Sequence, residues 1–197
     1  MCWSAEVSLN TFLFSLFGAS FAYFNKVISG SFFLFFFSIF SMQLVEYFTW
    51  NHLHNKKINR LLSQIGLFLV LIQIPLFVFS HDPFPYRLLL LGLFMVLGSI
   101  ILFRFDIDFS MNKAPNGHLT WNWLNLPPWM LFIYIIIFVG LTFFQKKYIE
   151  SLFFLFVICG IYYTHYTSNT WGSLWCWFCN LFALKLIGEV FLKDVCF

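Results

Sequence analysis

The chain has 197 residues, of which 61% are hydrophobic and only 10% are charged, with a formal net charge of +3. A soluble domain typically carries about 25% charged residues, so this composition excludes a water-soluble globular protein. The small, scattered positive charge excludes a nucleic-acid-binding surface, and the five cysteines are too few for a secreted disulfide scaffold.

Apolar segments long enough, or nearly long enough, to cross a bilayer follow one another along the whole chain. A hydrocarbon core of about 30 Å requires roughly 20 apolar residues per helix. The segments are approximately 7–24, 27–50, 61–80, 86–103, 129–144, 148–166 and 171–192. We therefore expect an all-α integral membrane protein, in which residues 1–197 form a single polytopic domain built as a bundle of about seven transmembrane helices.

Most connections between these segments are short, and the exception is the loop at 104–128. Pro115, Gly117 and the pair Pro127-Pro128 interrupt regular structure in this loop. Trp121 and Trp123 also lie in it, and Trp is enriched at membrane–water interfaces. The sequence therefore predicts one long interfacial loop that lies on the membrane surface.

The eight tryptophans are distributed asymmetrically. If the predicted helices alternate in direction, all of them lie at or near the side of the N-terminus, here called side A. Trp normally marks both interfaces, so this distribution predicts a Trp-rich vestibule on side A. Lys and Arg are divided equally between the two sides, so the positive-inside rule leaves open which side faces the cytoplasm and which membrane holds the protein.

Polar residues inside two predicted spans mark the first candidate site. Gln43 and Glu46 share one face near the end of the second span, and Ser173 and Asn180 lie near the start of the seventh. A carboxylate is rarely retained inside a span without a role. We expect these four residues to line a path for a small ion or a proton that opens on side A.

A Cys-x-x-Cys at the start of the seventh span is the second candidate site. Cys176 and Cys179 lie near a helix N-terminus, which favours a reactive thiolate. The pair is compatible with a membrane thiol oxidoreductase. Cysteines spaced i, i+3 also occur in apolar helices as ordinary small hydrophobic residues.

Other ionisable residues yield weaker candidates. Lys185 and Glu189 are spaced i, i+4 on the other face of the seventh span, where they can pair. Lys185 could also hold a retinal-like ligand, but no carboxylate lies one turn before it. His52 and His54 have no adjacent Cys or carboxylate, so we expect neither a metal nor a cofactor.

Three short motifs lie at side A: Met1-Cys2-Trp3-Ser4, the MQLVEYFTW run that ends the second span, and the GSLWC run that opens the seventh. As a set they resemble those of small, uncharacterised multi-span membrane proteins found in large DNA viruses and protists. The resemblance implies an all-helical membrane fold and no particular activity.

These observations favour a small polytopic membrane transporter or channel-like protein over an enzyme. The expected partners are the lipid bilayer, a small ion or proton, and further copies of the same chain. Two alternatives stay open. One is the thiol oxidoreductase that uses Cys176 and Cys179, and the other is a structural or assembly protein of a membrane particle.

Overall fold

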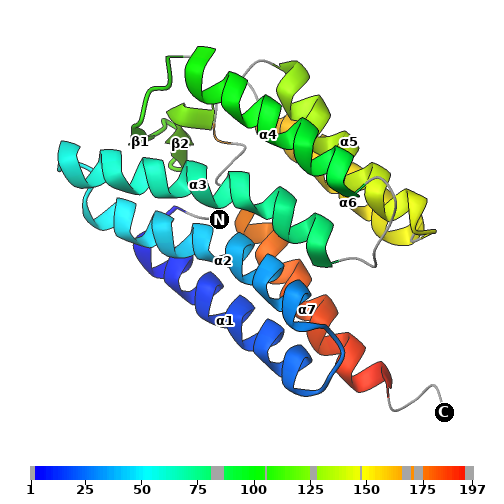
Figure 1. Cartoon of the computed structure of the whole chain (residues 1–197). Coiled ribbons are helices and arrows are strands. Elements are labelled where there is room, and N and C mark those ends of the chain that lie inside the picture. The colour runs from blue at the N-terminus through cyan, green and yellow to red at the C-terminus, as the bar shows by residue number, and fades with distance from the viewer. Residues whose placement is uncertain are drawn as a thin grey trace.

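The computed structural model describes residues 3–80, 87–104, 106–124, 128–146, 148–165, 170 and 175–193. Within these ranges the chain forms seven α-helices and one small hairpin (Figure 1). The elements are α1 Ala5–Phe24, α2 Gly30–Asn51, α3 Lys56–Ser80, α4 Arg87–Arg104, β1 Met111–Lys113, β2 Leu119–Trp121, the 3₁₀ helix η1 Asn122–Leu124, α5 Pro128–Phe144, α6 Tyr148–His165 and α7 Trp175–Lys193. The expected all-α fold is confirmed.

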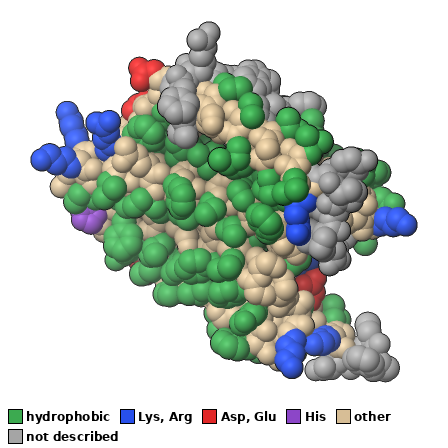
Figure 2. Space-filling view, viewed as in Figure 1, with side chains coloured by type: hydrophobic (Ala, Val, Ile, Leu, Met, Phe, Trp, Pro, Cys, Tyr) green, Lys and Arg blue, Asp and Glu red, His purple; other side chains and the backbone are tan. Residues whose placement is uncertain are grey.

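Helices α1, α2 and α3 are each long and apolar enough to cross a membrane, with 20, 22 and 25 residues. The outer surface of the helices is apolar as well. Large hydrophobic side chains are exposed on every helix, among them Phe17, Leu88, Ile149 and Phe156, which are 60–83% exposed. Figure 2 shows hydrophobic side chains over the middle of one face, with Lys and Arg toward its ends. Exposed apolar surface on this scale is typical of contact with lipid.

Phenylalanine side chains form the core between the helices. Phe77 of α3 lies 4.9 Å from Phe35 of α2 and 4.5 Å from Phe138 of α5, measured between ring centroids. Phe154 of α6 lies 5.6 Å from Phe182 of α7. Tilted and offset rings at these separations attract one another beyond the area that they bury. The Phe-rich composition therefore supplies a core that joins five helices.

Small residues on α1 allow it to pack closely between α2 and α7. The buried face of α1 includes Ser8, Thr11, Ser15, Gly18, Ala19 and Ala22. A Cβ atom added at Gly18 would lie 3.0 Å from the Ala183 Cβ and 3.1 Å from the Ala183 Cα. Helices in membranes commonly associate through small residues of this kind, because their backbones can then approach closely.

The long connection between α4 and α5, which the sequence predicts to lie on the membrane surface, is folded into a small hairpin and a 3₁₀ helix. Its strands β1 and β2 pair antiparallel, with Met111 opposite Trp121 and Lys113 opposite Leu119. Residues 106–124, here called the cap, pack against α3 (Figure 1). Trp121 and Trp123 are only 2% and 1% exposed. Both indoles thus lie inside the protein, where the Trp121 N–H has a hydrogen-bond partner and the Trp123 ring stacks on that of Trp121.

Candidate functional site

Asn59, near the start of α3, fastens the cap to the helices. Its side-chain Nδ2 donates to the Met111 carbonyl oxygen at 2.8 Å, and its Oδ1 accepts from the Met111 backbone N–H at 2.9 Å. Asn59 is 5% exposed and Met111 is fully buried. One amide side chain thus satisfies both backbone groups of Met111, which would otherwise be buried without partners.

Replacing Asn59 with Ala is expected to detach β1 from α3. The change leaves the buried N–H and C=O of Met111 unpaired, at a cost of about 1–3 kcal/mol. Hydrogen exchange at the cap amides, followed by mass spectrometry in detergent or lipid, should show faster exchange in this variant. Asn112→Ala is the matched control, because Asn112 is the exposed neighbour of Met111. Equal exchange in both variants would contradict the assigned role of Asn59.

The two tryptophans of the cap stack on one another and against α3. Their ring centroids lie 5.1 Å apart with an interplanar angle of 14°. A Cβ atom added at Gly66 would lie 2.8 Å from Cζ2 of Trp123, so only glycine leaves room for this ring. The contact with Gly66 fixes the position of the Trp pair above α2 and α3.

Glu46 of α2 lies beneath this Trp pair and is fully buried. The indole Nε1 of Trp121 donates a hydrogen bond to its Oε1 at 3.1 Å. Two further polar side chains, Ser8 of α1 and Cys179 of α7, are fully buried as well and lie near enough to act electrostatically on the carboxyl group, although Ser8 Oγ forms no hydrogen bond with it. Residues that are far apart in sequence therefore meet at one carboxyl group, and we call Ser8, Glu46, Trp121 and Cys179 the polar cluster.

The chemistry of the polar cluster follows from its burial. A buried carboxylate is costly unless it is hydrogen-bonded or its charge is compensated. Trp121, Ser8 and Cys179 are neutral groups, and the indole of Trp121 can only donate. A buried carboxyl group is neutralised when it binds a proton or a cation. The arrangement is therefore suited to holding one small positive ion.

The four residues expected to line the path fall into different environments. Gln43 and Glu46 are both fully buried on α2. Asn180 of α7 contacts α1 instead, where its Nδ2 donates to Thr11 Oγ1 at 3.5 Å. Ser173 lies outside the described residues. The side chains of Gln43 and Glu46 thus face the protein interior, not a water-filled opening.

Among the remaining candidates whose side chains the structure describes, Cys179 is the one that interacts electrostatically with Glu46. Cys159 and Cys179 are free thiols, and the side chain of Cys176 lies outside the described part of the chain. Nζ of Lys185 lies 2.8 Å from Oε1 of Glu189 on the outer face of α7.

The two histidines considered for a metal are in the turn between α2 and α3. The His52 ring Nδ1 lies 2.8 Å from the Phe48 carbonyl oxygen, and His54 is exposed. Among the described residues, no three His, Cys, Asp or Glu side chains cluster as a metal site would require.

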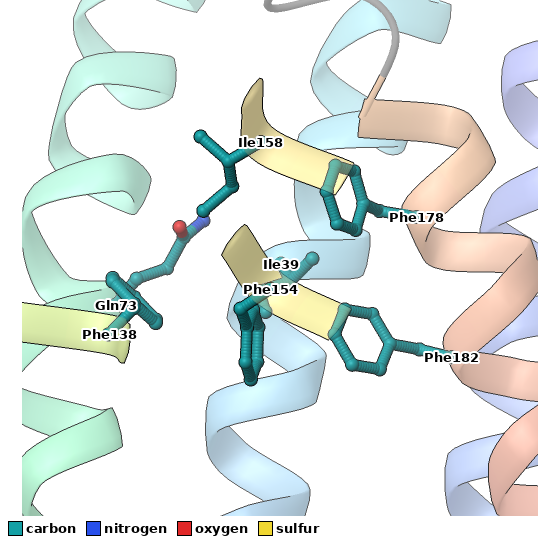
Figure 3. Close-up of a pocket in the computed structure, with 7 residues that line it drawn as sticks. All are labelled: Ile39, Gln73, Phe138, Phe154, Ile158, Phe178 and Phe182. Atoms are coloured by element: carbon teal, nitrogen blue, oxygen red, sulfur yellow. The ribbon is translucent and has the colours of Figure 1, made fainter. Parts of the chain in front are cut away.

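A small cavity lies deeper in the bundle. Ile39, Gln73, Phe138, Phe154, Ile158, Phe178 and Phe182 line it, and they come from α2, α3, α5, α6 and α7 (Figure 3). Its size corresponds to about one water molecule. All of the lining residues except Gln73 are apolar, so the cavity has the character of a packing gap.

Fold and site together define a helical protein with membrane-length apolar helices and a polar cluster buried beneath a cap. No protein-family model matches the chain, and no curated protein or solved structure is significantly similar to it. The function is therefore argued from the geometry of the site.

Proposed function

We propose that this chain is a multi-pass membrane protein of about seven spans that moves a proton or a small cation across its membrane, with Glu46 as the ion-binding group. The observation that carries the proposal is the complete burial of the Glu46 carboxyl group where α1, α2, α7 and the cap meet. Ionisable residues inside membrane segments usually mark ion or proton pathways. This is the transporter-like function that the sequence favours.

The position of the cap supplies a mechanism. Glu46 lies five residues before the end of α2, or about 7 Å along the helix axis from side A. The cap covers it from that side through Trp121. In this proposal the structure represents an occluded state, and an ion reaches Glu46 when the cap moves away. The arriving ion replaces the Trp121 N–H as the partner of the carboxyl group.

A second candidate function is that of a structural membrane protein. The observation that favours it is the dense Phe core, in which the cavity between α2, α3, α5, α6 and α7 has room for about one water molecule. In that case Glu46 and Trp121 serve only to hold the cap. Cys179 is fully buried, so its thiol is not accessible to an exchange partner. The thiol oxidoreductase alternative therefore has only the sequence motif in its favour.

The exchange Glu46→Gln tests the proposed function. Gln keeps the size and one acceptor oxygen of Glu46, so Trp121 retains a partner, but the side chain can no longer bind a proton or a cation. We expect flux in this variant to fall to the background of protein-free liposomes. The measurement is ion-gradient-driven uptake into liposomes, read with a pH-sensitive dye for protons and with radioactive tracers for alkali cations.

The control for this experiment is Glu6→Gln. Glu6 is an exposed carboxylate in the first turn of α1, at the same end of the bundle as the cap. Its exchange removes a charge without touching the polar cluster, so flux should stay at the level of the parent protein. Parent protein that moves neither protons nor alkali cations would overturn the proposal and leave the structural function. Undiminished flux in Glu46→Gln would exclude Glu46 as the ion-binding group.

A further inference from the structure

The buried face of α1 changes in chemistry along the helix. In the half nearer the cap it includes three hydroxyl side chains, those of Ser8, Thr11 and Ser15. In the other half its buried residues are glycine and alanine. Small residues of either kind allow helices to pack closely. Close packing therefore explains the glycine and the alanines, but it does not explain why the half nearer the cap carries hydroxyl groups.

Two of these hydroxyl groups have unused hydrogen-bonding capacity. Ser8 and Ser15 are fully buried, and among the residues that the structure describes neither Oγ atom has a hydrogen-bond partner. By contrast, the buried Ser38 of α2 donates to the Phe35 carbonyl oxygen of its own helix at 2.7 Å. A buried hydroxyl without a partner is unfavourable, and buried water molecules commonly satisfy such groups. Ser8 and Ser15 are therefore suited to binding water.

Other polar groups lie beside these hydroxyls on α2 and α7. Ser8 and Glu46 lie equally far from the short turn that joins the antiparallel helices α1 and α2, so the two residues are at about the same level (Figure 1). Thr11 Oγ1 accepts from Asn180 Nδ2 at 3.5 Å. Ser15 lies seven residues after Ser8, or about 10 Å further along the axis. Polar side chains thus continue from Glu46 into the bundle.

We propose that the hydroxyl groups of Ser8, Thr11 and Ser15 bind a row of water molecules, and that this row carries protons to and from Glu46, which makes the proton the transported ion. This inference rests on the proposed function and names its substrate. Cβ atoms three or four positions apart on a helix are separated by about 5–6 Å, which one water molecule can bridge. Each water or hydroxyl accepts one proton and passes another on, as in the polar proton relays of membrane transporters.

The row of water molecules ends where α1 and α7 touch. A Cβ atom added at Gly18 would lie 3.0 Å from the Ala183 Cβ, so the two helices are in direct contact there. Gly18 follows Ser15 by three residues, or about 4.5 Å. The cap closes the path at one end and this contact closes it at the other. A metal cation would need a set of oxygen ligands around it, whereas a proton needs only the hydrogen-bonded row.

Ser15→Ala tests the conducting role, because it removes one hydroxyl and leaves Glu46 and the cap in place. We expect proton flux into liposomes, read with a pH-sensitive dye, to fall about fivefold, the factor that corresponds to one hydrogen bond lost from the barrier. Ser38→Ala is the matched control, since the Ser38 hydroxyl bonds within its own helix, and its flux should equal that of the parent protein. Equal proton flux in Ser15→Ala and Ser38→Ala would overturn the proposal.

A crystal structure of the parent protein in lipid gives a readout that does not depend on flux. Ordered water within hydrogen-bond distance of Ser8 Oγ and Ser15 Oγ is the expected result, and dry packing at both atoms would overturn the proposal. Flux of alkali cations without protons would overturn it as well, but would leave the proposed function in place. A parent protein that moves no ion would refute the proposed function and the conducting role together, and any water at the two serines would then be structural.

Discussion

Replacing Trp121 with Phe is expected to destabilise the protein by about 1–3 kcal/mol, the range for removing the hydrogen-bond partner of a buried polar group. Phe keeps an aromatic ring beside Trp123 but lacks the N–H that donates to Glu46 at 3.1 Å. The fully buried carboxyl group then loses this donor. Chemical unfolding in detergent, followed by circular dichroism, measures the loss.

A second exchange at Glu46 separates this effect from general damage. Leu is close to Glu in size and needs no hydrogen bond, and removing both partners of a buried contact can be nearly neutral. Trp121→Phe/Glu46→Leu should therefore be more stable than Trp121→Phe alone. Trp3→Phe is the control, because Trp3 is 52% exposed. If Trp121→Phe is as stable as Trp3→Phe, the contact with Glu46 does not hold the cap.

Replacing Gly18 with Leu is expected to separate α1 from α7 and to destabilise the protein by about 3 kcal/mol, the upper part of the range for overpacking. The atoms in the way include the Ala183 Cα and carbonyl oxygen, each 3.1 Å from the added Cβ. Backbone atoms cannot be displaced by a change of rotamer, as the end of a flexible side chain can. The whole helix must therefore move, and its contact between Asn180 and Thr11 is stretched as well.

The control for Gly18→Leu is Gly140→Leu. Gly140 lies in α5, and a Cβ added there would meet no atom within 4 Å. Both exchanges add the same side chain to an apolar helix, so helix propensity and hydrophobicity change equally. Thermal unfolding in detergent should show a clear loss for Gly18→Leu only. A similar loss in both variants would mean that close packing at Gly18 is not what holds α1 against α7.

The helices could be predicted because their signal is local. Runs of apolar residues separated by short polar turns set the limits of each helix, as at Asn25-Lys26, where the first turn was expected. Lys26 adopts a positive φ of 59° there, and the Asn25 N–H bonds back to the Phe21 carbonyl oxygen. The placement of Gln43 and Glu46 on one face of α2 could also be predicted, because it depends only on their spacing along the helix. Both side chains are fully buried.

The partners of Glu46 could not be predicted, because they lie far away in sequence. Trp121 is 75 residues from Glu46 along the chain. Interfacial Trp is the commoner arrangement, and no local pattern distinguishes it from Trp that packs inside a cap. Gly66 was the available signal, since a glycine inside an apolar helix indicates close approach by another group. The polar spacing of Ser8 and Thr11, which places both on one face of α1, is a second such signal.

The most direct test of the central claim is infrared difference spectroscopy on the protein in lipid. Spectra recorded after a change in pH or in alkali cation report the carboxyl groups that bind or release an ion, and comparison with Glu46→Gln identifies the contribution of Glu46. We predict a carboxyl band that responds to the change in the parent protein and in Glu6→Gln but is missing in Glu46→Gln. Identical spectra for all three proteins would show that Glu46 exchanges no ion, and would contradict the proposed function.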